Sequence, residues 1–340
     1  MAKRVLVTGG AGYIGSVLTE MLLDQGFEVS VLDRFFFGPT LQHLNGRAGL
    51  TLIKGDIRWL EPSILNGVDA VCDLAALSND PAGELDPSKT MEINYRGRAR
   101  IAHLAKARGV RRYVLASSCS IYGFQEAILD ERSTPNPLTT YAQANLRAEQ
   151  EVLPLASEEF CVTVLRQATV YGLSPRMRFD LAINGMTLGV FEKGVIPLLR
   201  DGSQWRPMVH VRDASRAFGL VLKTAPRLVN GQIFNVGADE QNFQILPLAQ
   251  RIAEAVDRPF AYEWYGVPDH RSYRVSFRKI HDLLDYRAEY IPEDAAHEIF
   301  SALQKGQSTP DSRTRTVEWY KNLLQWHEIL RGVVLNDAVL

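Results

Sequence analysis

A glycine-rich turn between a strand-like run and a helix-like run is the feature that most constrains this chain. Val5 to Thr8 leads directly into Gly9-Gly10-Ala11-Gly12-Tyr13-Ile14-Gly15, and a helical pattern continues to Gln25. The glycines allow a tight turn, the approach of backbone N–H groups to a pyrophosphate, and close packing of helix on strand. The helix N-terminus adds partial positive charge. The spacing of Gly9, Gly12 and Gly15 therefore predicts a dinucleotide-binding β-α-β unit.

An acidic residue follows at the expected place. Asp33 ends the next strand-like run, about 20 residues after the glycine turn. A carboxylate at this point accepts hydrogen bonds from the adenosine ribose hydroxyls and repels a 2′-phosphate. Arg34 beside it offers a charge that could offset this repulsion. We expect NAD rather than NADP as the cofactor.

Two further segments are placed along the same cofactor. Asp56, with Ile57, follows the third strand-like run and is positioned to meet the adenine, although a turn aspartate would look the same. Leu74, Ala75 and Ala76 close the fourth strand. Their small side chains would let the backbone lie against the cofactor, and small core residues would have the same appearance.

Strand-like and helix-like segments alternate through the first half of the chain. Strands are expected at 4–8, 28–32, 50–54, 69–74, 113–117 and 161–167, with helices near 87–108 and 141–156. This alternation predicts an α/β fold with a Rossmann-type, doubly wound parallel sheet. We expect an NAD-binding domain over residues 1–172, to which later segments can return. Residues 173–340 should mainly form a smaller mixed α/β lobe that binds the substrate.

Composition excludes several other classes of protein. A formal net charge of −1 over 340 residues gives no general attraction for nucleic acid or acidic membranes. The local cluster Arg96-Gly97-Arg98-Ala99-Arg100 is interpreted as a solvated helix face. No apolar run approaches a membrane span, no signal-peptide pattern is present, and the three cysteines form no C-x-x-C pair. We expect a cytoplasmic protein without a metal site.

Several motifs occur together in an order that resembles the extended short-chain dehydrogenase/reductases. The motifs are T-G-G-A-G-Y-I-G, L-A-A, S-S-C-S-I-Y-G and a tyrosine heading a helix, followed by 165–172, 206–211 and 271–275. The nucleotide-sugar epimerases and dehydratases are the most similar members, and the resemblance extends from about residue 3 to beyond 290. It implies a cofactor site that also includes Tyr13, Ile14, Ile57, Asn94, Ser117, Tyr141, Asn145 and Ala168.

The resemblance also implies the acid/base pair. Tyr141 matches the family tyrosine, and Ser118, four residues before Tyr122, matches the family serine or threonine. Tyr141 would take the proton from a sugar hydroxyl while hydride leaves the same carbon for NAD⁺. Ser118 would hydrogen-bond the same oxygen.

One residue departs from the family pattern Tyr-x-x-x-Lys. Asn145 stands where the lysine should be, one helical turn after Tyr141. It can keep a hydrogen bond to the ribose but supplies no charge to lower the tyrosine pKa. Three interpretations follow: slower turnover or turnover at higher pH, chemistry through another base, or an attenuated protein that binds NAD and sugar without turnover.

A second departure concerns the type of reaction. The 4,6-dehydratases carry Asp-Glu where this chain has Cys119-Ser120. A serine hydroxyl does not readily replace a carboxylate in elimination, so epimerisation at C4 of a nucleotide sugar is the favoured reaction. A dehydratase, or a 3,5-type epimerase that uses an activated Cys119 thiol, stays open as an alternative. A pocket-lining thiol would look the same.

Cations expected to bind the substrate lie in the second half of the chain. By resemblance, Arg206 and Arg271 would meet the diphosphate, and Asn184 would precede the nucleotide loop. Arg176 and Arg178 could add charge, and Ser78 completes the expected substrate contacts. The resemblance implies a homodimer, and neither the sugar nor the base can be assigned from these residues.

Overall fold

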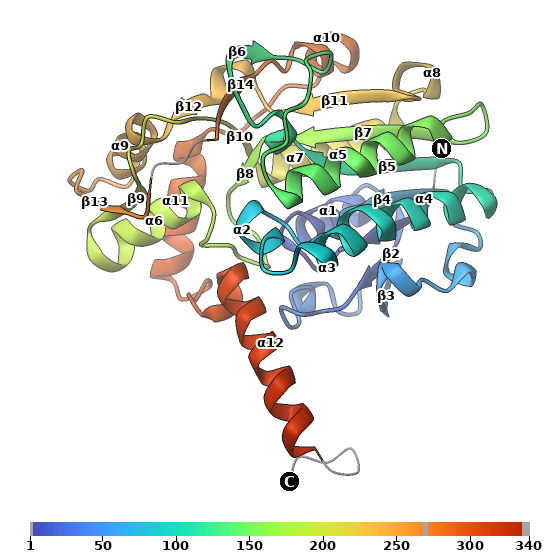
Figure 1. Ribbon diagram of the computed structural model, residues 1–340, viewed down its shortest axis with the longest axis horizontal. Helices are drawn as coiled ribbons and strands as arrows, with labels where there is room; N and C mark the ends of the chain where they lie inside the picture. Colours follow the sequence, from blue (N-terminus) through green and yellow to red (C-terminus); the bar gives the residue numbers. More distant parts are fainter. Residues whose placement is uncertain (1–2, 268–270, 335–340) are drawn as a thin grey trace.

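The computed structural model describes residues 3–267 and 271–334. Its centre is a seven-stranded parallel sheet in the order β11-β7-β5-β4-β1-β2-β3 (Figure 1). The strands are β1 Arg4–Thr8, β2 Glu28–Asp33, β3 Leu50–Lys54, β4 Ala70–Asp73, β5 Arg112–Ser118, β7 Cys161–Gln167 and β11 Gln232–Val236. The predicted fold class is confirmed. The seventh strand, β11, comes from the second half of the chain and lies beside β7.

Helices cover both faces of this sheet. On one face α4 Arg98–Ala107 and α5 Thr140–Val152 lie side by side, preceded by the short helices α2 Asp80–Gly83 and α3 Pro87–Met91 (Figure 1). On the other face α1 Tyr13–Asp24 packs against α7 Val211–Lys223.

Side chains of β1 alternate between the two faces. Val5 and Val7 join the core with α1 and α7, whereas Leu6 joins the core with α4 and α5. Burial on both faces explains why the strand is apolar at consecutive positions.

A smaller lobe gathers around its own apolar core, which includes Ile183, Met208, Leu248 and Ile299. Its helices are α6 Ala182–Lys193, α9 Ile245–Ala255 and α11 Pro292–Gln304. Its strands are β8 Thr169–Tyr171, β9 Ile196–Leu199, β10 Trp205–His210, β12 Asn242–Gln244 and β13 Tyr262–Tyr265. The remaining elements are β6 Phe124–Leu129, which pairs with β14 Ser272–Val275, and the helices α8 Pro226–Val229 and α10 Arg278–Leu284.

The last helix, α12 Thr316–Val333, begins between the lobes and then projects away from them (Figure 1). Its first turns rest on the loop after β2, where Trp319 Nε1 donates to the carbonyl of Phe36 at 2.7 Å. None of the helices in 3–267 and 271–334 has the length and apolarity needed to cross a membrane.

Candidate active site

The glycine turn adopts a shape that only glycine tolerates. Gly9 has φ of +67°, and a Cβ there would lie 2.9 Å from the backbone of Ala75. A Cβ on Gly15 would lie 2.2 Å from the carbonyl oxygen of Gly9. Gly12 caps α1 without a side-chain hydrogen bond to the first helical amides. The turn therefore presents backbone amides at a helix N-terminus, a cradle that fits a pyrophosphate.

Asp33 lies beside this turn, as the sequence predicts. Its carboxylate accepts from the amide of Ala11 at 3.0 Å and from the amide of Phe35 at 2.8 Å. Burial raises the pKa of this carboxyl, although the backbone hydrogen bonds oppose the rise. The carboxylate is thus fixed at the end of β2, where a ribose would approach.

The predicted adenine end of the site is an ion-pair cluster. Asp56 accepts from Arg58 and, at 3.0 Å, from Arg34. The guanidinium of Arg34 therefore pairs with Asp56 and not with Asp33. Ile57 is buried next to it.

The end of β4 approaches the glycine turn from the other side. The amides of Leu74 and Ala75 both donate to the hydroxyl of Thr8 at 3.2 Å. Asn94 is fully buried, and its amide group exchanges two hydrogen bonds with the backbone of Leu77, at 2.8 and 2.9 Å. Asn94 thereby shapes the loop after β4, which also contains Ala76 and Ser78.

Tyr141 and Asn145 lie one turn apart on α5, as their spacing predicts. Thr139 caps this helix by accepting from the amide of Ala142 at 3.2 Å, and Asn145 donates to the carbonyl of Tyr141 at 3.0 Å. Burial and the carboxylate of Asp80 raise the pKa of Tyr141. The charge of Arg98 and hydrogen bonding with Asn145 and Ser118 oppose this rise only in part, so the pKa of Tyr141 stays above its usual value.

Ser118 ends β5, beside Tyr141. Its oxygen accepts from the amide of Ser120 at 3.1 Å, which leaves the hydroxyl hydrogen to donate elsewhere. Ser117, one residue earlier, instead donates to Glu149 on α5. The predicted Tyr141 and Ser118 are thus brought together, whereas Ser117 faces the helix.

The thiol of Cys119 does not have the setting of an acid/base group. The side chain is fully buried, and its Sγ donates to the carbonyl of Arg166 at 3.3 Å. Burial raises the thiol pKa well above its usual value, so the group stays protonated. This geometry supports the interpretation of a buried thiol rather than the alternative of an activated cysteine.

Two of the predicted substrate cations meet one short loop. Arg178 donates to Ser78 at 3.2 Å and pairs with Asp180 at 2.6 Å. Arg271 pairs with Asp80, two residues after Ser78 at the start of α2. The carboxylate of Asp80 also raises the pKa of Tyr141. Both arginines therefore lie near the candidate acid/base.

Arg206 lies beside Arg271, whereas Asn184 is held by another part of the protein. Arg206 donates to the carbonyls of Trp205, at 2.8 Å, and of Arg271. The Asn184 amide accepts from Gly172 at 2.9 Å and donates to the Tyr13 hydroxyl at 3.0 Å and to Arg178 O at 2.9 Å. Asn184 therefore links α1 to the smaller lobe, a structural role that its sequence context does not reveal.

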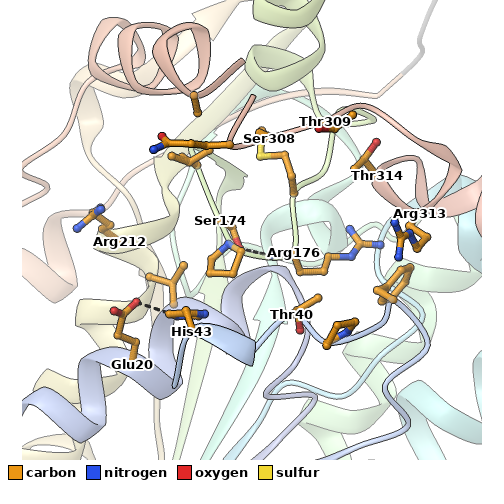
Figure 2. Close-up of a pocket in the computed structure, with 18 of the residues that line it drawn as sticks. Glu20, Thr40, His43, Ser174, Arg176, Arg212, Ser308, Thr309, Arg313 and Thr314 are labelled. Carbon is orange, nitrogen blue, oxygen red and sulfur yellow. Dashed lines mark hydrogen bonds and ion pairs between the residues drawn. The ribbon is translucent and has the colours of Figure 1, made fainter. Parts of the chain in front are cut away.

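Arg176 lines a cavity of about 710 Å³, between α1 and the segment 302–314 (Figure 2). Its Nη2 donates to Thr316 at 2.9 Å, and its guanidinium stacks 3.6 Å from the centre of the Phe37 ring. Burial and the neighbouring Arg178 lower its pKa to about 10. Neither Tyr141 nor the glycines of the turn line this cavity.

Sequence reasoning missed two polar groups near the acid/base. Gln167 ends β7 in register with Ser118, and both atoms of its buried amide lack a hydrogen-bond partner within the described residues. Ser120 Oγ is likewise buried without a partner there. Buried polar atoms without a partner are uncommon in native proteins and call for an explanation, such as a catalytic role or a bound water or ion. Gln167 ends the predicted strand at 161–167, and Ser120 lies in the S-S-C-S segment; these positions were the available signal.

Arg98 corrects an interpretation of the sequence. It was expected on a solvated helix face, yet only 1 % of it is exposed. A π-helical turn, Glu92–Gly97, precedes it, and Ile101, Ala102 and Ala105 continue its buried face. The spacing i, i+3, i+4, i+7 was the signal that placed Arg98 inside.

The fold and this site define a class of protein. The chain belongs to the NAD-dependent epimerase/dehydratase family, whose model matches residues 5–237. UDP-glucuronic acid decarboxylase 1 of Danio rerio is 30 % identical over 266 residues, which are 75 % of this chain and 61 % of that protein. An uncharacterised UDP-glucose epimerase, YtcB of Bacillus subtilis, is 29 % identical over 253 residues, covering 70 % of this chain and 78 % of that protein.

A solved structure, MoeE5 in complex with UDP-glucuronic acid and NAD, superimposes with a TM-score of 0.79. It is 27 % identical and covers 89 % of this chain and 99 % of its own. The relatives are epimerases, decarboxylases and dehydratases, that is, isomerases or lyases. The predicted family resemblance and class of enzyme are confirmed, and NAD is the cofactor found in the structural neighbours.

Proposed function

We propose that this protein is an NAD-dependent UDP-sugar 4-epimerase. The observation that carries the proposal is the arrangement of Tyr141, Ser118 and the glycine turn at the carboxyl edge of one parallel sheet, with no carboxylate at positions 119 and 120. The names of the relatives, which act on UDP-glucose or UDP-glucuronic acid, support the choice of UDP.

The chain's own residues supply the binding and the proton transfers. When bound, NAD would supply hydride transfer at C4 of the sugar, first removing a hydride and then returning it to the opposite face of the C4 carbonyl. Tyr141 takes the proton of the 4-hydroxyl and later gives it back, while Ser118 hydrogen-bonds the same oxygen. Arg206 and Arg271 bind the diphosphate, and Arg178 adds positive charge. Asp80 competes with the diphosphate for Arg271, and Asp180 pairs with Arg178.

The cofactor site fits NAD rather than NADP. The amides at the start of α1 bind the pyrophosphate, and Asp33 accepts from the ribose hydroxyls. Arg34 pairs with Asp56 and so does little to offset the repulsion of a 2′-phosphate.

Product analysis tests the proposal. The purified protein is first denatured and its released small molecules are identified by mass spectrometry. It is then incubated with UDP-glucose and, separately, with UDP-glucuronic acid. Conversion of either to its C4 epimer, lost in Tyr141→Phe, is the expected result. A pentose with release of CO₂ would identify a decarboxylase, and a dehydrated keto sugar a dehydratase.

Binding of NAD and UDP-sugar without any product would support the alternative of an attenuated binding protein.

The homodimer implied by the family resemblance stays a prediction. We propose it also because α12 carries exposed apolar side chains, including Trp326, Ile329 and Val333. Light scattering of the purified protein should give a molar mass of twice that of one chain.

A further inference from the structure

A buried guanidinium lies directly behind the acid/base tyrosine. Arg98 begins α4, and its Nη1 donates to Oδ1 of Asn145 at 2.9 Å. Asn145 in turn donates to the carbonyl of Tyr141 at 3.0 Å, one turn earlier on α5. Arg98 and Asn145 are each 1 % exposed, so water screens the connection poorly.

The cation is held by a buried counter-ion. Nε of Arg98 lies 3.4 Å from Oδ2 of Asp73, which is fully buried at the end of β4. Nη2 donates to the carbonyl of Asp73 at 3.0 Å and to the carbonyl of Ala116. Since an arginine remains charged in proteins, this site holds a guanidinium cation, paired with a carboxylate, inside the sheet–helix layer. Burying such a pair is expensive, and apolar residues would stabilise the core as well or better.

We propose that Arg98 supplies, through Asn145, the positive charge that stabilises the Tyr141 phenolate. The chain has thereby moved the cation from α5, where the sequence carries Asn145, to α4. Tyr141 acts as acid/base only within the proposed function, on which this inference rests. Arg98 is a positioning residue, because it reaches Tyr141 through Asn145.

Other charges around Tyr141 come from several elements. Asp80 of α2 opposes formation of the phenolate, and Arg271 pairs with Asp80. Glu84, at the end of α2, accepts from the Thr140 amide at 2.7 Å. The carboxylates of Asp80 and Glu84 thus lie on the α2 side of α5. Arg98 provides, from α4, a positive charge that favours the Tyr141 phenolate.

A titration that needs no turnover tests this role. The full chain is labelled with ¹³Cζ-tyrosine and titrated with NAD present, and Tyr141→Phe assigns the resonance. Arg98→Met combined with Asp73→Asn removes both buried charges, and Asp73→Asn alone is the matched control. We expect the pKa of Tyr141 to rise by about 1–2 units in the double variant and not to rise in the control.

Adding Asn145→Lys to the double variant restores a cation beside Tyr141. The pKa should then return toward that of the unchanged protein, because the lysine replaces the lost positive charge. An unchanged Tyr141 pKa in the folded double variant, or no return on adding the lysine, overturns the inference.

Circular dichroism establishes whether each variant is folded. Should the double variant not fold, Asn145→Leu breaks the link from Arg98 to α5 together with the hydrogen bonding from Asn145 to Tyr141, and a rise in the pKa of Tyr141 is expected. An unchanged pKa there overturns the inference. The result is separate from the proposed reaction, which fails instead if Tyr141→Phe still epimerises UDP-sugars at the normal rate.

Discussion

Glu149 and Arg166 form a buried bidentate ion pair between α5 and β7. Nη2 of Arg166 lies 2.7 Å from one carboxylate oxygen, Nε lies 3.1 and 3.2 Å from the two oxygens, and both side chains are at most 4 % exposed. Ser117 also donates to Glu149, and Arg166 donates to Tyr122 at 2.9 Å. The pair fixes the helix that carries Tyr141 to the strands that carry Ser118 and Gln167.

Removal of one partner from this pair should destabilise the fold strongly. Glu149→Ala leaves Arg166 as an uncompensated buried charge, so we expect a loss of about 3–5 kcal/mol. Glu151→Ala on the same helix breaks only an exposed pair with His103 and should cost less than about 1 kcal/mol. Urea denaturation measures both, and equal losses would contradict the role given to the buried pair.

A methyl group at Gly15 should abolish cofactor binding. The added Cβ would meet the backbone of Gly9 and Gly10, which cannot move without opening the turn. Gly15→Ala should be purified without NAD and should bind added NAD more than about 100-fold more weakly, about 2.7 kcal/mol. Gly219→Ala in α7 meets only the amide end of Gln25 and serves as the control. Isothermal titration calorimetry with NAD measures the affinity of both variants. Normal binding of NAD by Gly15→Ala would show that the turn is not part of the cofactor site.

Asp33 should set the preference for NAD. Asp33→Ser removes the acceptor for the ribose and the repulsion of a 2′-phosphate. We expect NAD to bind about 10-fold more weakly, near 1.4 kcal/mol, and the discrimination against NADP to shrink. Arg34→Gln, which loses a pair with Asp56, should alter NAD affinity less. If the ratio of the NAD affinity to the NADP affinity is unchanged in Asp33→Ser, Asp33 does not set the cofactor preference.

Asp69 should contribute stability that depends on pH. Burial opposes its ionisation, but hydrogen bonds from the amides of Arg4 and Lys3 and from Arg111 lower its pKa to about 2. A depressed folded-state pKa stabilises the protein above the unfolded value, near 3.8, and this stability is lost as pH falls toward 2.

Replacement of that carboxylate measures the effect. Asp69→Asn should cost about 2 kcal/mol at pH 6, and the difference from the unchanged protein should narrow between pH 4 and pH 2. Asp24→Asn, which breaks an exposed pair with Arg47, is the control and should cost less than about 1 kcal/mol. Urea denaturation at several pH values gives the result, and a difference that stays constant with pH would contradict it.

The sequence could predict the parts of the fold that depend on local pattern. The glycine turn, Asp33 and the spacing of Tyr141 and Asn145 are set by backbone geometry within single β-α units, and the structure places them as expected. The return of β11 to the sheet depends instead on long-range pairing with β7, which no local pattern specifies.

The remaining site residues depend on partners that are distant in the sequence. The Asn184 amide hydrogen-bonds Tyr13 and Gly172, and Arg176 stacks on Phe37. Neither side chain therefore contacts the cluster around residues 78–80, whereas Arg178 donates to Ser78. Arg98 was misplaced because its charge was given more weight than the periodicity of the helix around it. A buried cation is identified by its counter-ion, here Asp73, and that pairing is visible only in three dimensions.

The fate of the hydrogen at C4 tests the proposed reaction most directly. UDP-glucose carrying deuterium at C4 is incubated with the protein, and the product is examined by NMR and mass spectrometry. A 4-epimerase that returns the same hydrogen should give the C4 epimer with deuterium retained at C4, no accumulation of reduced nicotinamide, and no product from Tyr141→Phe. Loss of deuterium to solvent, accumulation of NADH, or a product with C4 uninverted would contradict the account.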